Sequence, residues 1–299
     1  MKAARFHAAH DIRLDTIPTP TASDTHVLVE VHWSGICGSD MHEYAHGPQT
    51  VPTESRPHPI TKDHIPVVFG HEFCGRIVHV PPGSGLQVGE AVMVDPRLNC
   101  AGCRRCGEGN SHACEQWGFR GLSGGGGGFS EYVAVEERML YRIPEEVVGG
   151  GGGEGRGLDF VALIEPLAVA WHALSVAEVE NWSGKSVLVL GGGPVGVAVL
   201  FVLRARGCTG TVVVSEPTAK RKEFLKGLED VLVVDPRSED VGERCREVTG
   251  GEGVDVVFDC AGVQRGMEDG AGALRFRGKF VNVAGWSGPV SEPCLSWCV

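Results

Sequence analysis

A short apolar segment, a glycine-rich turn and a second apolar segment follow one another directly in the second half of the chain. The predicted strand Val187–Leu190 leads into Gly191-x-Gly193-x-x-Gly196, and a helix is predicted over Val197–Arg206. Glycines in this position let the backbone turn tightly and approach a pyrophosphate at the helix N-terminus. A lone GxGxxG is weak evidence, but the flanking strand and helix favour a dinucleotide site over glycines that only permit close helix–sheet packing.

An acidic residue follows at the distance that a ribose contact requires. Glu216 stands twenty residues past Gly196, at the end of the next apolar segment. A carboxylate there can bind ribose hydroxyls and repels a 2′-phosphate, which favours NAD over NADP. Lys220 and Arg221 leave NADP open, because a basic residue nearby can accept the extra phosphate. The expected cofactor-binding residues are Gly191, Gly193, Pro194, Val195, Gly196, Glu216 and Arg221.

The patterning changes at Glu165-Pro166. Beyond it, continuous apolar segments alternate with helical ones, which predicts a doubly wound parallel sheet. The expected strands are Ser186–Leu190, Thr211–Val214, Val231–Val234, Val254–Phe258 and Lys279–Val283. Before it, short alternating runs such as 26–31 and 75–80, separated by turn residues, predict an irregular, mainly β domain. The glycine tracts 124–128 and 149–153 are predicted to be loops.

Four of the eleven cysteines lie within fifteen residues, at Cys100, Cys103, Cys106 and Cys114. Their spacing brings four thiolates to one tetrahedral centre, and a closed shell of four sulfurs is typical of structural zinc. An iron–sulfur cluster also uses four cysteines, but no redox partner signature accompanies this one. The scattered cysteines are expected to be small buried hydrophobic residues.

Composition excludes several classes of partner. The 299 residues, 42% of them hydrophobic, suffice for two domains with cores of their own. A net charge of −11 disfavours nucleic acid and anionic membranes. No secretory signal pattern follows Met1, so we expect a cytoplasmic protein with free thiols.

A second set of metal-ligand residue types is dispersed along the chain. Cys37 lies in Gly-Ile-Cys-Gly-Ser-Asp, His71 and Glu72 lie in Gly-His-Glu-Phe, and Glu165 lies in Ile-Glu-Pro. Taken singly, these residues have ordinary alternatives, which the residues alone favour. Cys37 may be a core cysteine, His71 a capped residue in a turn, and Glu165 a surface acid.

The order of these segments changes their interpretation. These segments, the cysteine cluster and the glycine motif follow one another in the order of the zinc-containing medium-chain alcohol dehydrogenases. The chain resembles that family up to about Trp286. The segments 42–44, 47–48, 121–128 and 215–217, with the Pro-rich stretch that runs to Pro66, look most like the 2,3-butanediol dehydrogenase branch, with sorbitol and threonine dehydrogenases as nearest rivals. The resemblance implies a GroES-like catalytic domain over 1–165 and a Rossmann NAD-binding domain over 166–286 that lacks its last strand.

The resemblance also implies roles for the dispersed residues. Cys37, His71 and Glu165 would ligate a catalytic zinc, with Glu72 as a fourth or exchanging ligand. Asp40 would orient His71, with a solvated turn aspartate as the alternative. Ser39 and His42 would carry the alcohol proton to water, with a surface histidine as the alternative for His42.

The implied reaction is reversible oxidation of a secondary alcohol or vicinal diol, a small-molecule substrate, with NAD and two zinc ions per chain. A polyol dehydrogenase of the sorbitol or xylitol type is the alternative enzyme. An inactive zinc- and nucleotide-binding relative is the alternative from another class.

The segment 287–299 resembles nothing in the family, whose members continue through a sixth Rossmann strand and a return segment. We expect a truncated or mispredicted gene end, with an open apolar edge at Phe280–Val283. Because the family pairs its sixth strands between subunits, homo-oligomerisation is expected to be impaired.

Overall fold

The computed structural model describes residues 1–149 and 157–285. The chain divides into two compact units, Met1–Glu165 and Pro166–Val299. The expected tail 287–299 and the glycines 150–153 lie outside the described residues. Gly149, predicted to lie in a loop, instead closes the short helix α3.

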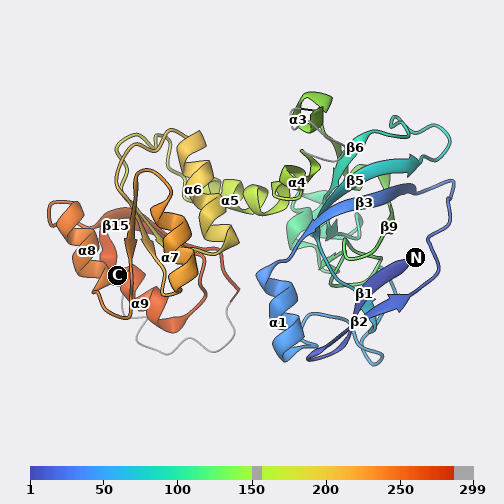
Figure 1. Ribbon diagram of the computed structural model, residues 1–299, viewed down its shortest axis with the longest axis horizontal. Helices are drawn as coiled ribbons and strands as arrows, with labels where there is room; N and C mark the ends of the chain where they lie inside the picture. Colours follow the sequence, from blue (N-terminus) through green and yellow to red (C-terminus); the bar gives the residue numbers. More distant parts are fainter. Residues whose placement is uncertain (150–156, 286–299) are drawn as a thin grey trace. The chain divides into compact units, whose positions relative to one another are not determined.

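The first unit is built on antiparallel strands (Figure 1). A three-stranded sheet has the order β2-β1-β4, and a five-stranded sheet has the order β10-β6-β5-β3-β9. The strands are β1 (Lys2–Ala8), β2 (Asp11–Thr16), β3 (Val27–Gly35), β4 (Val67–Val68), β5 (Glu72–His79), β6 (Ala91–Val94), β9 (Tyr132–Val135) and β10 (Leu140–Arg142). Alternate residues such as Val27 and Val29 are fully buried. The predicted irregular β domain is confirmed.

Short helices and one two-stranded antiparallel sheet complete this unit. They are α1 (Gly38–His46), β7 (Arg97–Leu98), α2 (Arg104–Gly107), η1 (Ser111–Ala113), β8 (Gly118–Phe119), η2 (Glu137–Met139), α3 (Glu145–Gly149) and α4 (Leu158–Val161). The glycine tract 124–128 forms no helix or strand, as predicted.

The second unit contains a five-stranded parallel sheet in the order β13-β12-β11-β14-β15. The strands are β11 (Val187–Leu190), β12 (Val212–Ser215), β13 (Val231–Val234), β14 (Val254–Asp259) and β15 (Leu274–Asn282). Among the described residues β15 forms one edge of the sheet. The predicted doubly wound sheet is confirmed, and impaired oligomerisation stays a prediction.

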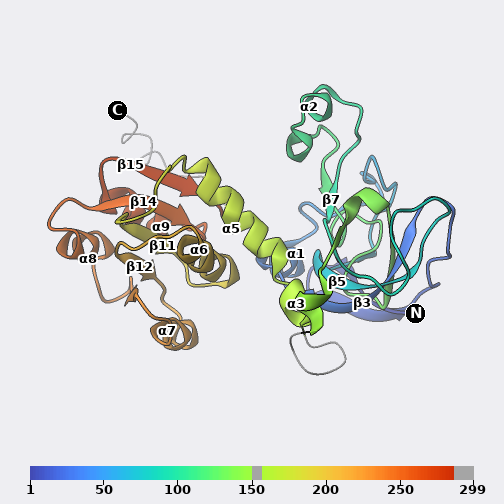
Figure 2. The same cartoon turned by 90° about the horizontal axis from the view of Figure 1, so that it is seen from above.

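Helices cover both faces of this sheet (Figure 2). They are α5 (Ile164–Val176), α6 (Pro194–Ala205), α7 (Ala219–Lys226), α8 (Val241–Val248) and α9 (Gln264–Ala273). Successive residues of β11 face opposite sides: Val187 and Val189 pack in the core with α5 and α6, whereas Leu188 and Leu190 pack in the core with α8 and α9. This alternation explains why every residue of the strand is apolar.

The two largest differences from the sequence prediction are at the starts of α6 and β15, while the other predicted boundaries of this unit lie within one residue of those observed. Helix α6 begins at Pro194 and not at Val197, because proline has the φ of a first helical turn and needs no N–H partner there. Strand β15 begins at Leu274, five residues before the predicted start, since its first residues pair irregularly with β14.

One stretch of the described chain, Leu158–Val176, is long and apolar enough to cross a membrane on length and composition alone. It combines α4 and α5, and 33% of its most apolar window is buried inside the protein. Core helices meet the same criterion, so this stretch is weak evidence for a membrane span.

Candidate active site, metal centre and nucleotide loop

The N-terminus of α1 positions Cys37 and Asp40. Strand β3 ends at Gly35, and Cys37 occupies the position before the first helical residue. The Cys37 backbone N–H donates to Oδ2 of Asp40 at 2.9 Å. Because Asp40 is 3% exposed, this hydrogen bond is partly shielded from solvent, and it fixes both residues at the helix start.

The opposite side of the cluster comes from β5. Gly35 pairs with Glu72 across β3 and β5, and a Cβ atom at Gly35 would lie 2.1 Å from Oε2 of Glu72. Glycine at this position therefore leaves the space that the Glu72 carboxylate occupies. As a result, one ligand atom each from Cys37, His71 and Glu72 lie within 4.8 Å of one another.

His71 lies between two polar neighbours. Its Nδ1 is 3.5 Å from Oδ1 of Asp40, and its Nε2 is 3.3 Å from Oγ of Ser39. Burial opposes protonation of His71, but Asp40 and Cys37 outweigh it and raise its pKa to about 10. The cluster combines a half-buried thiol, a buried imidazole and buried carboxylates. Titratable groups gathered in this way are typical of a functional site such as a metal centre.

Glu165 lies close to this cluster without joining its three donor atoms. It stands at the start of α5, and burial raises its pKa to about 7, with the charges of His71 and Glu72 acting in opposite directions. Burial also raises the pKa of Glu72. A nearby cation would favour the ionised form of both carboxylates.

A pocket of about 580 Å³ opens beside the cluster. Ser39, His71 and Glu165 contribute to its wall, so three of the predicted residues share one cavity. The remaining lining residues are Gln49, Thr50, Pro52, Arg56, Pro57, His58, Pro59, Trp117, Phe119, Leu122 and Ser123. The exposed surface of this wall is mostly apolar, which is typical of a small-molecule site.

His42 is placed differently. Its ring packs edge-on against His46 on α1, with centroids 5.1 Å apart. His42 is not among the described residues that line the pocket. The structure therefore brings Ser39 to the pocket and leaves His42 on the helix behind it.

The four-cysteine segment forms a lobe of its own in the first unit, around α2 (Figure 2). The Sγ atoms of Cys103 and Cys106 are 3.5 Å apart, as are those of Cys100 and Cys114. Those of Cys103 and Cys114 are 3.9 Å apart. Four sulfurs at about 2.3 Å from one tetrahedral centre are separated by about 3.8 Å, so the cluster has the dimensions of a zinc site.

Backbone N–H groups support this cluster. Cys103 N–H points at Sγ of Cys100, and the N–H groups of Cys100 and Gln116 point at Sγ of Cys114, each at 3.3 Å. Donors of this kind stabilise thiolates. Backbone donors lower the pKa of Cys103 to about 6.

Two of the three glycines of the motif in the second unit have a steric reason. Gly191 has a φ of 90°, and a Cβ at Gly196 would lie 2.0 Å from the carbonyl oxygen of Gly191. A Cβ at Gly193 would make only ordinary contact, 3.5 Å from Arg221. Gly191 and Gly196 build the turn, and the turn leads into the N-terminus of α6 at Pro194, the end of a helix that favours an anion.

Glu216 lies directly beneath this turn. Its Oε2 accepts from Gly192 N–H at 2.8 Å, and its Oε1 accepts from Thr218 N–H at 2.7 Å. The Arg221 guanidinium is 3.6 Å from Oε2. These donors outweigh burial and lower the pKa of Glu216. The residues expected to bind a dinucleotide therefore lie together at the carboxyl end of the parallel strands.

Two family models match the chain. The alcohol dehydrogenase GroES-like domain matches residues 23–145, and the zinc-binding dehydrogenase domain matches residues 194–297. The (R,R)-butanediol dehydrogenase of Bacillus subtilis is 38% identical over 96% of this chain and 78% of its own length. This chain belongs to the zinc-containing medium-chain alcohol dehydrogenase family.

Other similar proteins support this family membership. A crystal structure of 2R,3R-butanediol dehydrogenase from Bacillus subtilis matches with a TM-score of 0.84 and 37% identity, over 97% of this chain and 79% of that one. The sorbitol dehydrogenase of Bacillus subtilis is 29% identical over 95% of this chain and 74% of its own length. The dehydrogenase thus has a GroES-like domain and a Rossmann domain, as its sequence predicted.

Sequence reasoning missed part of the pocket wall of the dehydrogenase. His58 is 8% exposed, and its Nδ1 faces the N–H groups of Ile60 and Thr61. Thr50 donates through its hydroxyl and backbone N–H to the buried Glu43, each at 2.6 Å. The Pro-rich stretch around these residues signalled family membership, but nothing in its pattern indicated which side chains face the cavity.

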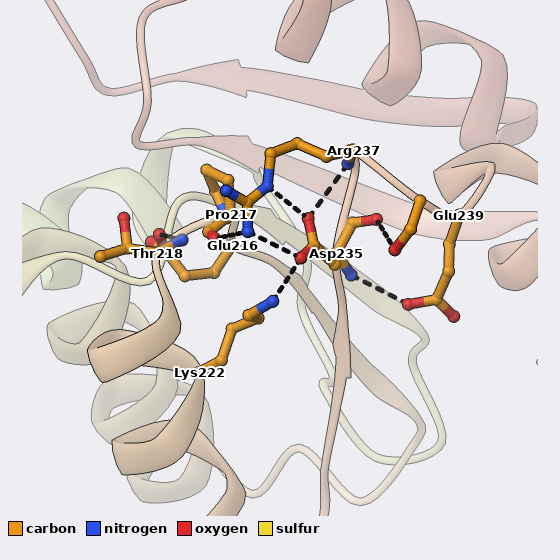
Figure 3. Close-up of polar contacts among 8 residues, drawn as sticks. Glu216, Pro217, Thr218, Lys222, Asp235, Arg237 and Glu239 are labelled. Carbon is orange, nitrogen blue, oxygen red and sulfur yellow. Dashed lines mark hydrogen bonds and ion pairs between the residues drawn. The ribbon is translucent and has the colours of Figure 1, made fainter.

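A charged cluster beside Glu216 was also missed. Asp235 follows β13 and contacts both Lys222 and Arg237, close to the Glu216 loop of the dehydrogenase (Figure 3). The sequence contained a sign of this cluster, because Asp235 and Arg237 lie within three residues of the strand end. Without the strand order, nothing indicated that this strand end lies beside Glu216.

Proposed function

We propose that this dehydrogenase oxidises a vicinal diol of the 2,3-butanediol type to an α-hydroxyketone, with NAD and two zinc ions per chain. The observation that carries the proposal is the pocket lined by Ser39, His71 and Glu165 next to the donor atoms of Cys37 and Glu72. The 38% identity to a butanediol dehydrogenase, against 29% to a sorbitol dehydrogenase, favours the diol.

The residues present fit a catalytic zinc. Cys37, His71 and Glu165 offer the sulfur, nitrogen and oxygen donors that zinc uses, with Glu72 as a fourth or exchanging ligand. The buried Oδ1 of Asp40 and Nδ1 of His71 have no hydrogen-bond partner among the described residues. A hydrogen bond between them would hold the ring with Nε2 as the ligand atom.

The charges of the proposed zinc ligands support the same assignment. One thiolate and one carboxylate, from Cys37 and Glu165, would neutralise a divalent zinc. Glu72 as a further ligand would make the site net negative, which disfavours an alkoxide beside it. We therefore infer that Glu72 binds the metal when substrate is absent.

When bound, zinc supplies a Lewis acid for the substrate hydroxyl, and NAD supplies the hydride acceptor. Ser39 Oγ, on the pocket wall and 3.3 Å from His71 Nε2, takes the hydroxyl proton. His42, on the same helix, receives it and releases it to water. The apolar wall around Trp117 and Phe119 excludes water from the reacting carbon.

The second metal has a structural role in this proposal. Cys100, Cys103, Cys106 and Cys114 leave no open position for a substrate, so the cluster stabilises its lobe and takes no part in the reaction.

NAD is assigned to the Rossmann domain. Gly191, Gly193, Pro194, Val195 and Gly196 would hold the pyrophosphate. Glu216 would bind the adenosine ribose, and Arg221 would contact the ribose or the phosphate. The nine cysteines of the described residues are free thiols, which fits a cytoplasmic enzyme.

The test is NADH formation by the purified protein with 2,3-butanediol, sorbitol and threonine as substrates, alongside zinc analysis. We expect the highest kcat/KM with the butanediol and two zinc ions per chain. A higher kcat/KM with sorbitol would reassign the substrate to polyols. No turnover with any substrate, despite two bound zinc ions, would leave an inactive nucleotide-binding relative.

A further inference from the structure

Three charged side chains lie beside the loop that presents Glu216, and the proposed reaction uses none of them. Strands β12 and β13 are parallel neighbours, with Ser215 opposite Val234. Glu216 N–H donates to the carbonyl of Val234 at 3.0 Å. The residues that follow the two strands, Glu216 and Asp235, are therefore brought to the same edge of the sheet (Figure 3).

Asp235 is shared by two cations. Its Oδ1 accepts from Nε of Arg237 at 3.0 Å and from the Arg237 backbone N–H at 3.1 Å. Its Oδ2 accepts from Nη2 of Arg237 at 2.9 Å and from Nζ of Lys222. These contacts hold the pKa of Asp235 well below its ordinary value. One carboxylate thus fixes a cation from α7 and one from its own loop.

The cluster is also tied to the Glu216 loop. The Arg237 guanidinium, held by Asp235, donates through Nη2 to the carbonyl of Pro217. Glu216, the residue before Pro217, accepts from the N–H of Gly192 and from the N–H of Thr218, the residue after Pro217. The arginine therefore anchors the middle of the short segment that sets the position of the Glu216 carboxylate.

Removal of Asp235 would leave two unneutralised cations next to this segment. The Arg237 side chain is 64% exposed, so without its carboxylate partner it is free to reorient. Guanidinium and ammonium groups are strong ligands for phosphate. A 2′-phosphate on the ribose at Glu216 would then find a positive partner that the intact cluster withholds.

We propose that Asp235 is a specificity-determining residue for the nucleotide, which holds Lys222 and Arg237 away from the ribose and anchors the Pro217 segment. Discrimination against a 2′-phosphate then has two parts, repulsion by Glu216 and neutralisation of nearby cations by Asp235. This inference rests on the proposed binding of NAD at Glu216.

The test is equilibrium binding of NADH and NADPH to the full chain, followed by nicotinamide fluorescence. We expect the parent protein to prefer NADH. In Asp235→Asn, whose side chain has the same shape without the charge, NADPH should bind up to about fivefold more tightly, which is the scale of exposed ion pairs. NADH should bind a few-fold more weakly, because the Pro217 anchor is loosened.

Two further variants isolate the cause. Glu239→Gln changes an acid of the same loop, which accepts from Asp235 N–H but leaves both cations paired. Its NADH/NADPH preference should equal that of the parent. Replacing Lys222 and Arg237 by Met in the Asp235→Asn background should abolish the gain in NADPH affinity.

The outcomes separate this inference from the proposed function. A parent protein that binds neither nucleotide, or prefers NADPH, would overturn NAD use itself. A parent that prefers NADH with an unchanged preference in Asp235→Asn would overturn only the role of Asp235. If that variant does not fold by circular dichroism, Arg237→Met tests the anchor, and unchanged NADH affinity there would overturn the role.

Discussion

Oδ1 of Asp40 lies 3.5 Å from Nδ1 of His71, and both atoms are buried. A carboxylate at Nδ1 keeps the proton on that nitrogen and leaves Nε2 as the metal ligand. In the proposed zinc site, Asp40 would therefore be a positioning residue that acts through His71.

Asp40→Asn should therefore lower kcat/KM and zinc affinity by about 10–100-fold, the usual effect of losing such a partner. Zinc retention after dialysis against a weak chelator would be measured together with kcat/KM. Asp24→Asn, at an exposed aspartate, is the control and should match the parent. Full zinc retention in Asp40→Asn would argue against this role.

The two proposed zinc sites should respond differently to the same chemical change. Cys37→Ser and Cys103→Ser each remove one sulfur ligand, and each should lose about one zinc per chain. Cys37→Ser should abolish turnover with little change in thermal stability. Cys103→Ser should lower the unfolding midpoint while residual zinc still supports turnover. Unchanged zinc content in Cys37→Ser would refute its assignment as a ligand.

Much of the fold was predictable because its signals are local. The strand Val187–Leu190, the glycine turn and Glu216 are close in sequence, so their spacing alone predicts a nucleotide loop. The four cysteines are similarly clustered, and the structure places Sγ of Cys114 within 3.9 Å of those of Cys100 and Cys103. Short-range motifs of this kind need no knowledge of topology.

The remaining features depend on tertiary pairing. Gly35 matters because β3 pairs with β5 and places Glu72 against it. Asp235 matters because β13 lies next to β12. His58 faces the pocket through a loop with no periodic pattern. For Gly35 and Asp235 the partner is distant in sequence, and only the strand order reveals the contact.

Glu216 should control the choice between NAD and NADP. Its side chain is buried and held by two backbone N–H groups beneath the glycine turn. Glu216→Gln, which keeps the shape and removes the charge, should reduce the NAD/NADP ratio of kcat/KM by at least about tenfold. The measurement is steady-state kinetics with each cofactor on one substrate. An unchanged ratio would show that Glu216 does not contact the ribose.

Two glycine-to-alanine changes should have opposite effects on stability. A Cβ at Gly196 would lie 2.0 Å from the Gly191 carbonyl oxygen, so Gly196→Ala should destabilise by about 1–3 kcal/mol and weaken NADH binding. Gly272 is an exposed residue of α9, and an added Cβ there would have no neighbouring atom within 4 Å. Gly272→Ala should therefore stabilise by up to about 1 kcal/mol. Urea unfolding and NADH titration would measure both effects, and equal stability of the two variants would contradict this steric account.

Asp255 should make the Rossmann domain sensitive to acid. Its Oδ2 accepts from the backbone N–H and hydroxyl of Ser186, each at 2.9 Å, and its Oδ1 pairs with Arg275 at 2.7 Å and Lys185 at 3.3 Å. Burial raises the pKa of Asp255, but these partners outweigh it and bring the pKa below its ordinary value of 3.8.

A carboxyl group with a lowered pKa stabilises the folded state above its unfolded pKa, and this contribution disappears as the pH falls through the folded pKa. Asp255→Asn should therefore be less stable than the parent by about 1–3 kcal/mol at neutral pH, the scale of hydrogen bonds to a charged group. The difference should persist down to about pH 4 and shrink below it. Urea unfolding of both proteins across this range would test the prediction, and zinc loss in acid, common to both, cancels in the comparison. A difference that stayed constant below about pH 4 would show that the charge of Asp255 does not stabilise the domain.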